Sequence, residues 1–228
     1  MITLLLPTRA RPANVRRLLT SIDDTADGDV AVYLYVDDDD PTRDEVTKLA
    51  HEWGAITIVG ERVVLSEMWN RCWREAEPEV AMQCGDDIVF RSSGWDARVL
   101  ATFDEHPDRI AFVHGNDGFQ YDRIGTHGFL HRRWVETVGY FVPPYFSSDY
   151  NDLWLSEVAD ALGRRRYLPD VVTEHMHPVA GKGSWDQTHE ERLARHRRDR
   201  VDDLYRRLAP ERAADVARLR RVILEERG

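Results

Sequence analysis

The chain has 228 residues, of which 42% are apolar and seven are tryptophan, so it can bury a sizeable core and lacks the composition of a disordered protein. Its formal net charge at pH 7 is −10. The acidic excess lies in residues 1–180, whereas residues 181–228 hold a small basic excess. An acidic body of this kind argues against a protein that coats nucleic acid without sequence preference.

No window approaches the roughly 20 consecutive apolar residues that cross a bilayer. The apolar start at residues 1–7 is too short for a signal peptide and has no basic residues ahead of it. The two cysteines, Cys72 and Cys84, have neither a CxxC nor a zinc-like spacing, so we expect two buried free thiols. These features predict a soluble, cytoplasmic protein with no membrane span.

Short apolar runs alternate with helical patterns through the first part of the chain. Strands are expected at residues 3–7, 30–36, 55–59 and 80–83, where β-forming and apolar residues are concentrated. Helices are expected at residues 14–22, 42–53 and 66–77, the last with Ser66 as its cap. This alternation predicts an α/β fold, with a mostly parallel sheet covered by helices on both faces.

The second part of the chain is less regular. Residues 114–145 are rich in glycine, histidine and aromatic residues and are expected to form loops and short strands. A helix is expected at 147–163 and a last strand at 166–173. Two amphipathic helices, at about 186–207 and 211–226, are expected to pack on the body. We therefore predict one domain at residues 1–180 and a helical extension at 181–228.

Two adjacent carboxylates, Asp86 and Asp87, follow the buried strand expected at residues 80–83. Ionised carboxylates side by side repel, so they need a cation, a proton or strong hydrogen bonds. A divalent metal would satisfy them and would take its remaining oxygen ligands from a phosphate. The alternative is a pair of turn-forming aspartates after a strand.

Three polar segments fall at the carboxyl ends of expected parallel strands. They are residues 7–9, residues 37–40 and the pair Asp86-Asp87. In open α/β sheets, ligands bind in the crevice outside the carboxyl ends of the strands. The sequence therefore predicts a site at this edge of the sheet.

The order and spacing of six segments resemble a nucleotide-sugar glycosyltransferase of the GT-A fold, within the large family 2 group. The segments are residues 4–9, 35–38, 86–90, 128–141, 148–155 and 167–175. The resemblance covers about residues 1–178 and implies a Rossmann-like GT-A domain, here with C-terminal helices added. Two positions depart from the family pattern. Cys84 or Gly85 replaces the first aspartate of the metal motif, and Ser148 replaces the glutamate before the base.

The resemblance implies a nucleotide-binding role for one group of residues. Pro7, Thr8 and Arg9 would lie beside the nucleotide, because a guanidinium suits phosphate or base contacts. Further contacts are expected from Asp37 or Asp38, Asn70 and Asp86, with Asp86 reaching ribose or a water. Each group has an ordinary structural alternative. Residues 7–9 could form a cap and turn before the next helix, and Asn70 could be an ordinary exposed residue. Residues 37–40 could form a solvated acidic turn, which we favour for Asp39 and Asp40.

A second group implied by the resemblance carries the metal and the base. Asp87 is the expected metal ligand. A second ligand is expected from the other side of the site, either His175 or, as the alternative to it, His177. Imidazole together with carboxylate suits Mn²⁺ or Mg²⁺. The metal would neutralise a diphosphate leaving group. Asp149 is the expected general base, with Asp152 as a rival, and the reaction is expected to invert configuration.

Two further clusters have open interpretations. Side chains at residues 114–117, Phe119, Tyr121 and His127 line an acceptor pocket or pack as ordinary loop residues. A basic cluster on the expected 186–207 helix either guides an anionic acceptor such as DNA or forms a solvated face, and its interleaved acids favour the solvated face. Its members are Arg192, Arg195, His196, Arg197, Arg198 and Arg200.

These observations predict a metal-dependent glycosyltransferase that uses a nucleotide-diphosphate sugar, by default a UDP-sugar, and a hydroxyl acceptor such as a glycan or small molecule. One alternative acceptor is a hydroxylated base in phage DNA. A second alternative is a nucleotidyltransferase, although residues 7–12 lack the glycine-rich phosphate loop such enzymes usually carry. A third is a binding module for nucleotide sugars without turnover.

Overall fold

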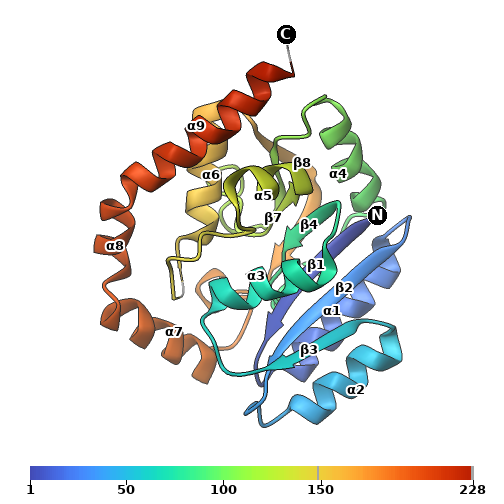
Figure 1. Ribbon diagram of the computed structural model, residues 1–228. Coiled ribbons are helices and arrows are strands. Elements are labelled where there is room, and N and C mark those ends of the chain that lie inside the picture. Colours follow the sequence, from blue (N-terminus) through green and yellow to red (C-terminus); the bar gives the residue numbers. More distant parts are fainter. Residues whose placement is uncertain (148, 227–228) are drawn as a thin grey trace.

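A computed structural model describes residues 1–147 and 149–226 (Figure 1). Over these residues the chain forms one mixed eight-stranded sheet in the order β3-β2-β1-β4-β7-β6-β8-β5. The strands are β1 (Ile2–Thr8), β2 (Val30–Asp37), β3 (Ile56–Gly60), β4 (Val80–Gln83), β5 (Ile88–Phe90), β6 (Phe112–Asn116), β7 (Gly128–His131) and β8 (Arg165–His175).

Helices connect and cover the strands. In the first part they are α1 (Pro12–Thr25), α2 (Arg43–Trp53), α3 (Leu65–Ala76) and α4 (Trp95–Asp104). In the second part they are α5 (Arg132–Val138), α6 (Asn151–Leu162), the 3₁₀ turn η1 (Pro178–Ala180), α7 (Gln187–Arg198), α8 (Val201–Arg207) and α9 (Ala209–Glu225). Within the described residues, no helix combines the length and apolar composition needed to cross a bilayer.

The first half of the sheet is parallel, as its sequence pattern predicts. β1 pairs with β2 on one side and with β4 on the other, and β2 pairs with β3. Every residue of β1 is buried, because helices cover both faces of this strand. Its side chains alternate between two cores: Leu4 and Leu6 pack with α1 and α2, whereas Leu5 packs with α3.

The second half of the sheet is mixed. β7 lies antiparallel between β4 and β6, β6 is parallel to β8, and β5 is antiparallel to β8. Ile88 of β5 pairs with His175 of β8. The Met176 amide donates a hydrogen bond to the Asp87 carbonyl at 2.7 Å. The start of β5 therefore lies beside the end of β8, which brings Asp87 and His175 together.

The C-terminal helices follow one another along one side of the molecule (Figure 1). Leu219 and Ile223 of α9 are buried in the core that also holds Trp134 of α5 and Trp154 of α6. α7 differs, because His189 is its only buried residue among those described. Apolar packing therefore anchors α9, whereas α7 is attached through polar side chains.

The predicted α/β architecture, with helices on both faces of the sheet, is confirmed, and four of the seven strand pairings among the described residues are parallel. Several details differ from the sequence prediction, among them the strand β5, which was not expected. α4 and α5 were not expected as helices. The helix expected at 186–207 is divided into α7 and α8 at Arg200, whose φ is +49°. Ser66 does not cap α3, since the cap position is Val64 and the Ser66 hydroxyl donates to the Phe146 carbonyl at 2.6 Å.

Candidate functional site

A cavity of about 380 Å³ opens at the carboxyl edge of β1, β2 and β4. Its walls come from these strand ends, from the loops before β5 and β7, from the end of β8 and from α7. The residues that the sequence singled out and that line it are Pro7, Thr8, Arg9, Asp37, Asp86, Asp87, Phe119, His127, Asp149, Asp152, His175, His177, Arg192 and Arg195. Segments distant in the sequence thus meet in one cavity, as the parallel topology predicts.

Asp86 is held inside the wall of this cavity. Its carboxylate accepts hydrogen bonds from the Thr8 hydroxyl at 2.8 Å and from the Arg11 guanidinium at 3.0 Å. Burial raises the pKa of the Asp86 carboxyl to about 6, since Arg11 only partly offsets the loss of water and Asp87 adds repulsion. Arg11 was not identified as a site residue from the sequence, because there it is simply one of two arginines in a short loop.

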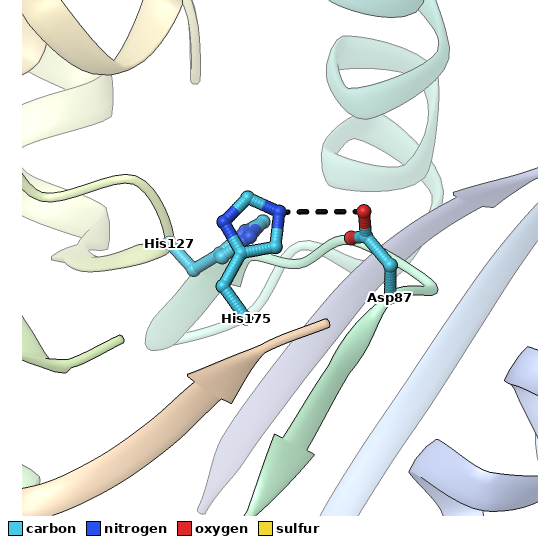
Figure 2. A group of neighbouring side chains, drawn as sticks. All are labelled: Asp87, His127 and His175. Atoms are coloured by element: carbon cyan, nitrogen blue, oxygen red, sulfur yellow. Dashed lines mark hydrogen bonds and ion pairs between the residues drawn. The ribbon is translucent and has the colours of Figure 1, made fainter. Parts of the chain in front are cut away.

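Asp87, His127 and His175 form a compact group at the centre of the site (Figure 2). One ligand atom from each of the three lies within 4.8 Å of the other two. The His175 Nε2 atom is 3.3 Å from Asp87 Oδ2. Burial acts to raise the pKa of the Asp87 carboxyl, but the hydrogen bond with His175, with the positive charge of Arg11 nearby, leaves that pKa below its ordinary value.

The two imidazoles have unused ring nitrogens. The buried Nε2 of His127 and the buried Nδ1 of His175 have no hydrogen-bond partner among the described residues. The other nitrogen of His127, Nδ1, lies 3.3 Å from the Gln83 carbonyl, and a proton on Nδ1 would leave the Nε2 lone pair available. Burial lowers the pKa of His127 to about 4, which keeps the ring neutral and able to ligate. Carboxylate and neutral imidazole are donors that fit Mn²⁺ or a similar divalent ion.

His177, predicted as the competitor of His175, lines the cavity but is not part of this group. Its Nδ1 accepts a hydrogen bond from the Val179 amide at 3.1 Å, and its ring stacks on Phe119 with centroids 5.9 Å apart. His127 takes the position next to His175 instead. In the sequence analysis His127 was considered only for the acceptor pocket. Its nearness to Gln83 follows from the pairing of β7 with β4, which the sequence does not reveal.

The acids at the end of β2 and just after it differ in their surroundings. Asp37 is buried, accepts from Arg9 at 2.9 Å through Oδ2, and leaves its buried Oδ1 without a partner among the described residues. Asp38 is exposed and does not line the cavity. Asp40 corrects the expectation of a solvated turn: it is buried, and its carboxylate accepts from the Ala10 amide and from the amide and hydroxyl of Thr42.

Asn70 does not lie where the resemblance implied. It is 4% exposed and does not line the cavity. Its two N–H groups donate to the carbonyls of Ser66 and Val142, and its oxygen accepts from the amides of Phe141 and Val142. Because all four hydrogen-bonding positions of the amide are used, no atom remains for a nucleotide. Asn70 joins α3 to the loop after α5.

Asp149, the predicted base, lies in the wall of the cavity below α7. Its carboxylate accepts from the Arg192 guanidinium, and its Oδ2 lies 2.6 Å from His196 Nδ1. The other His196 nitrogen is 3.3 Å from Asp202. Asp152 also lines the cavity, and burial raises its pKa to about 6. Ser148, which replaces the family glutamate, lies outside the described residues.

Ion pairs between described residues attach α7 and its N-cap across the cavity. The N-cap Asp186 binds Arg11 through two contacts, at 2.7 and 2.8 Å. Glu191 pairs with Arg62 from the loop after β3, and Arg192 pairs with Asp149. In the basic cluster only Arg192 and Arg195 line the cavity, whereas Arg197, Arg198 and Arg200 are exposed. The prediction of a solvated face therefore holds for part of the cluster.

The other residues considered for an acceptor pocket lie in different places. Phe119 lines the cavity. His114 is buried within β6, and Tyr121 is exposed. One oxygen of Asp117 accepts hydrogen bonds from the amides of Phe119, Gln120 and Tyr121. None of His114, Asp117 and Tyr121 lines the cavity, so the expectation of an acceptor pocket is not met at these three positions.

No family model and no curated protein matches this chain. Solved structures do match. The mannosyltransferase PcManGT from Pyrobaculum calidifontis, in complex with GDP-Man and Mn²⁺, has a TM-score of 0.64 at 17% identity, over 95% of this chain and 74% of that one. S. aureus TarS 1-349 in complex with UDP has a TM-score of 0.58 at 14% identity, over 86% and 71%.

A cytidylyltransferase from Leptospira borgpetersenii also matches, with a TM-score of 0.52 at 13% identity over 74% of each chain. Against the longer TarS chain, this protein covers 43% of the length. These similarities show that the chain has the GT-A fold on which nucleotide-sugar transferases are built. Fold alone does not specify chemistry, which has to be argued from the site.

Proposed function

We propose that this protein is a metal-dependent glycosyltransferase that moves a sugar from a nucleotide diphosphate to a hydroxyl acceptor. The observation that carries the proposal is the Asp87–His127–His175 group, which lies in the same cavity as Asp37 and Asp149. Such a transfer needs three parts: a metal site, a group that holds the nucleotide by hydrogen bonds, and a base. The structural similarity to nucleotide-sugar transferases supports sugar transfer in general.

The donor would lie along the β1 and β2 ends. The unpartnered Asp37 Oδ1 is suited to accept from a base N–H or a ribose hydroxyl, and Arg9 and Arg11 supply positive charge near the phosphates. The neighbours carry GDP-Man in one case and UDP or UDP-GlcNAc in the other. We propose a UDP- or GDP-sugar as the donor, with UDP as the first choice.

Asp87, His127 and His175 would hold the divalent ion, Mn²⁺ or Mg²⁺, which when bound neutralises the charge of the leaving diphosphate as a Lewis acid. Asp149 would take the proton of the acceptor hydroxyl as its oxygen forms the new bond to the anomeric carbon. The nucleoside diphosphate leaves from the opposite face, so the configuration inverts. Since Arg192 and His196 engage the Asp149 carboxylate, this step requires at least Arg192 to move away.

A nucleotidyltransferase is the second candidate, because a cytidylyltransferase is among the matching structures. Such an enzyme joins a nucleoside triphosphate to a sugar phosphate and releases pyrophosphate. The two reactions differ in their products, so a single assay separates them.

The test is incubation with Mn²⁺ and UDP-glucose, UDP-GlcNAc or GDP-mannose, followed by measurement of the released nucleotide. Release of UDP or GDP supports sugar transfer or its background donor hydrolysis. Release of sugar 1-phosphate that depends on added pyrophosphate supports the second candidate. Binding without any turnover would contradict both and support a binding module.

The base assignment is tested with Asp149→Asn and its rival Asp152→Asn. We expect Asp149→Asn to leave donor binding intact and to lower transfer by a factor of about 10² or more, since general-base catalysis contributes that much. Asp152→Asn should retain transfer within a few-fold. Wild-type transfer by the Asp149 variant would show that another group takes the proton.

A further inference from the structure

Two arginines of α7 lie toward the cavity, although most of the helix surface around them is solvated. Arg192 and Arg195 are three residues apart and therefore share one face of the helix. Both line the cavity, whereas Arg197 in the following turn is exposed and does not. The helix thus presents a pair of guanidinium groups to whatever occupies this side of the cavity.

The charge of Arg195 is poorly balanced. Among the described residues its ion-pair partner is Glu191 at 3.8 Å, and Glu191 also pairs with Arg62. The Arg195 side chain is 27% exposed, and its buried Nε has no hydrogen-bond partner among the described residues. Burial lowers the pKa of this guanidinium, so its charged form has lost hydration without full compensation. An anionic ligand would restore the balance.

Arg192 already forms an ion pair with the Asp149 carboxylate. Its Nε, like that of Arg195, is buried and has no hydrogen-bond partner among the described residues. His196 contacts the same carboxylate at 2.6 Å. These two contacts engage both oxygens of the Asp149 carboxylate, so an acceptor hydroxyl has to compete with Arg192 or His196 for the oxygen that would take its proton. If Asp149 is the base, something must draw Arg192 away before the proton is transferred.

We propose that the acceptor carries an oxyanion, phosphate or carboxylate, close to its reactive hydroxyl, and that Arg192 and Arg195 bind it. Binding moves Arg192 from Asp149 to the acceptor, which both orients the hydroxyl and releases the base. The planar guanidinium fork suits either oxyanion. This inference rests on the proposed function and adds the class of acceptor. The donor diphosphate is a poorer match for the pair, because Arg192 contacts the base side of the cavity.

The test is isothermal titration of inorganic sulfate into protein already saturated with Mn²⁺ and UDP, or GDP if UDP does not bind. Sulfate imitates a phosphate group without precipitating manganese, acetate in a separate series represents a carboxylate, and chloride keeps the ionic strength constant. We expect one of the two anions to bind the nucleotide-loaded protein. Arg195→Gln and Arg192→Gln should weaken that binding about tenfold or more, the effect of losing a charge-assisted hydrogen bond.

Arg197→Gln is the matched control on the same helix and should change anion binding less than twofold. The anion should also shift the NMR signals of the His196 ring, because Arg192 leaves the carboxylate that the two residues share. The inference is overturned if neither anion binds, if Arg197→Gln weakens binding equally, or if Arg195→Gln weakens UDP or GDP binding and leaves the anion unaffected. Failure of both nucleotides to bind overturns the proposed function, and this inference with it.

Discussion

Gly85 leaves the space in which the central group of the site is assembled. A Cβ atom at this position would lie 2.8 Å from Cε1 of His127 and 2.9 Å from Oδ1 of Asp87, closer than real Cβ contacts allow. Any side chain here would therefore displace one of the two. Gly85 is also one of the two positions at which the first aspartate of the usual metal motif is missing. We propose that His127 supplies the ligand that this departure removes.

The choice between His127 and His177 can be tested by two matched substitutions. We expect His127→Gln to weaken Mn²⁺ binding at least tenfold, because an amide replaces an imidazole nitrogen next to Asp87 and His175. His177→Gln should keep the affinity within about threefold, since that ring caps η1 and stacks on Phe119. Manganese titration followed by electron paramagnetic resonance measures both. Equal losses in the two variants would restore His177 as a ligand.

A buried histidine outside the metal group makes stability depend on pH. Burial lowers the pKa of His114 to about 4, from an ordinary value near 6.5. Between these values the unfolded chain binds a proton that the folded chain does not, so the free energy of unfolding falls as the pH is lowered from 6.5 toward 4. The contribution of His114 between pH 7.5 and pH 5 is on the order of 2 kcal/mol.

Urea unfolding of His114→Gln at these two pH values tests this contribution. The variant should lose less stability on acidification than the wild type by about that amount, even if it is less stable at pH 7.5. The same change at exposed His51, in the last turn of α2, is the matched control and should leave the pH dependence as it is. An unchanged acid slope in His114→Gln would mean that the ring is protonated in the folded state.

At the scale of elements, α7 and α9 show two ways of attaching a helix. α9 contributes Leu219 and Ile223 to the core, which is a contact that salt does not weaken. α7 is attached through the pairs Asp186–Arg11, Glu191–Arg62 and Arg192–Asp149. Ion pairs near the surface contribute about 1 kcal/mol or less each and are screened by salt. α7 is therefore the element most easily detached from the cavity.

Salt should open α7 selectively. Raising ionic strength from 0.1 to 1 M shortens the Debye length from about 10 Å to about 3 Å. We expect hydrogen exchange of α7 amides to accelerate several-fold, while exchange in α9 changes little. Arg11→Gln should produce the same acceleration at low salt, because it removes the two contacts to Asp186. Exchange in α7 that does not respond to salt would show that packing, not charge, attaches the helix.

At the scale of the whole molecule, the parallel half of the sheet could be predicted from local patterns. β1 to β4 and their helices were expected within a few residues, because apolar runs and helical periodicity are properties of short windows. The positions of Asp37, Asp86 and Asp87 at strand ends followed directly. The mixed half could not be predicted, since the insertion of β7 between β4 and β6 depends on pairing between distant segments.

The same difference explains the outcome for the site. Asp87 and His175 were predicted from strand ends and from the family resemblance, and the structure brings them together at 3.3 Å. His127 joins them only through the position of β7, which no short window reveals. Asn70 lies on the expected helix, but the Val142 loop that occupies its amide is 72 residues away in the sequence. Arg11 and α7 likewise meet only in the folded chain.

The most direct test of the central claim is the affinity of UDP and GDP with and without Mn²⁺, measured by isothermal titration for wild type, Asp87→Ala and Asp38→Ala. If Asp87 helps to hold a metal that contacts the diphosphate, Mn²⁺ will tighten nucleotide binding at least tenfold in the wild type. The same gain is expected in Asp38→Ala, the control, because Asp38 is exposed and does not line the cavity. Asp87→Ala will show no such gain. Equal nucleotide affinity with and without Mn²⁺ in the wild type, or an undiminished gain in a folded Asp87→Ala, would contradict the account.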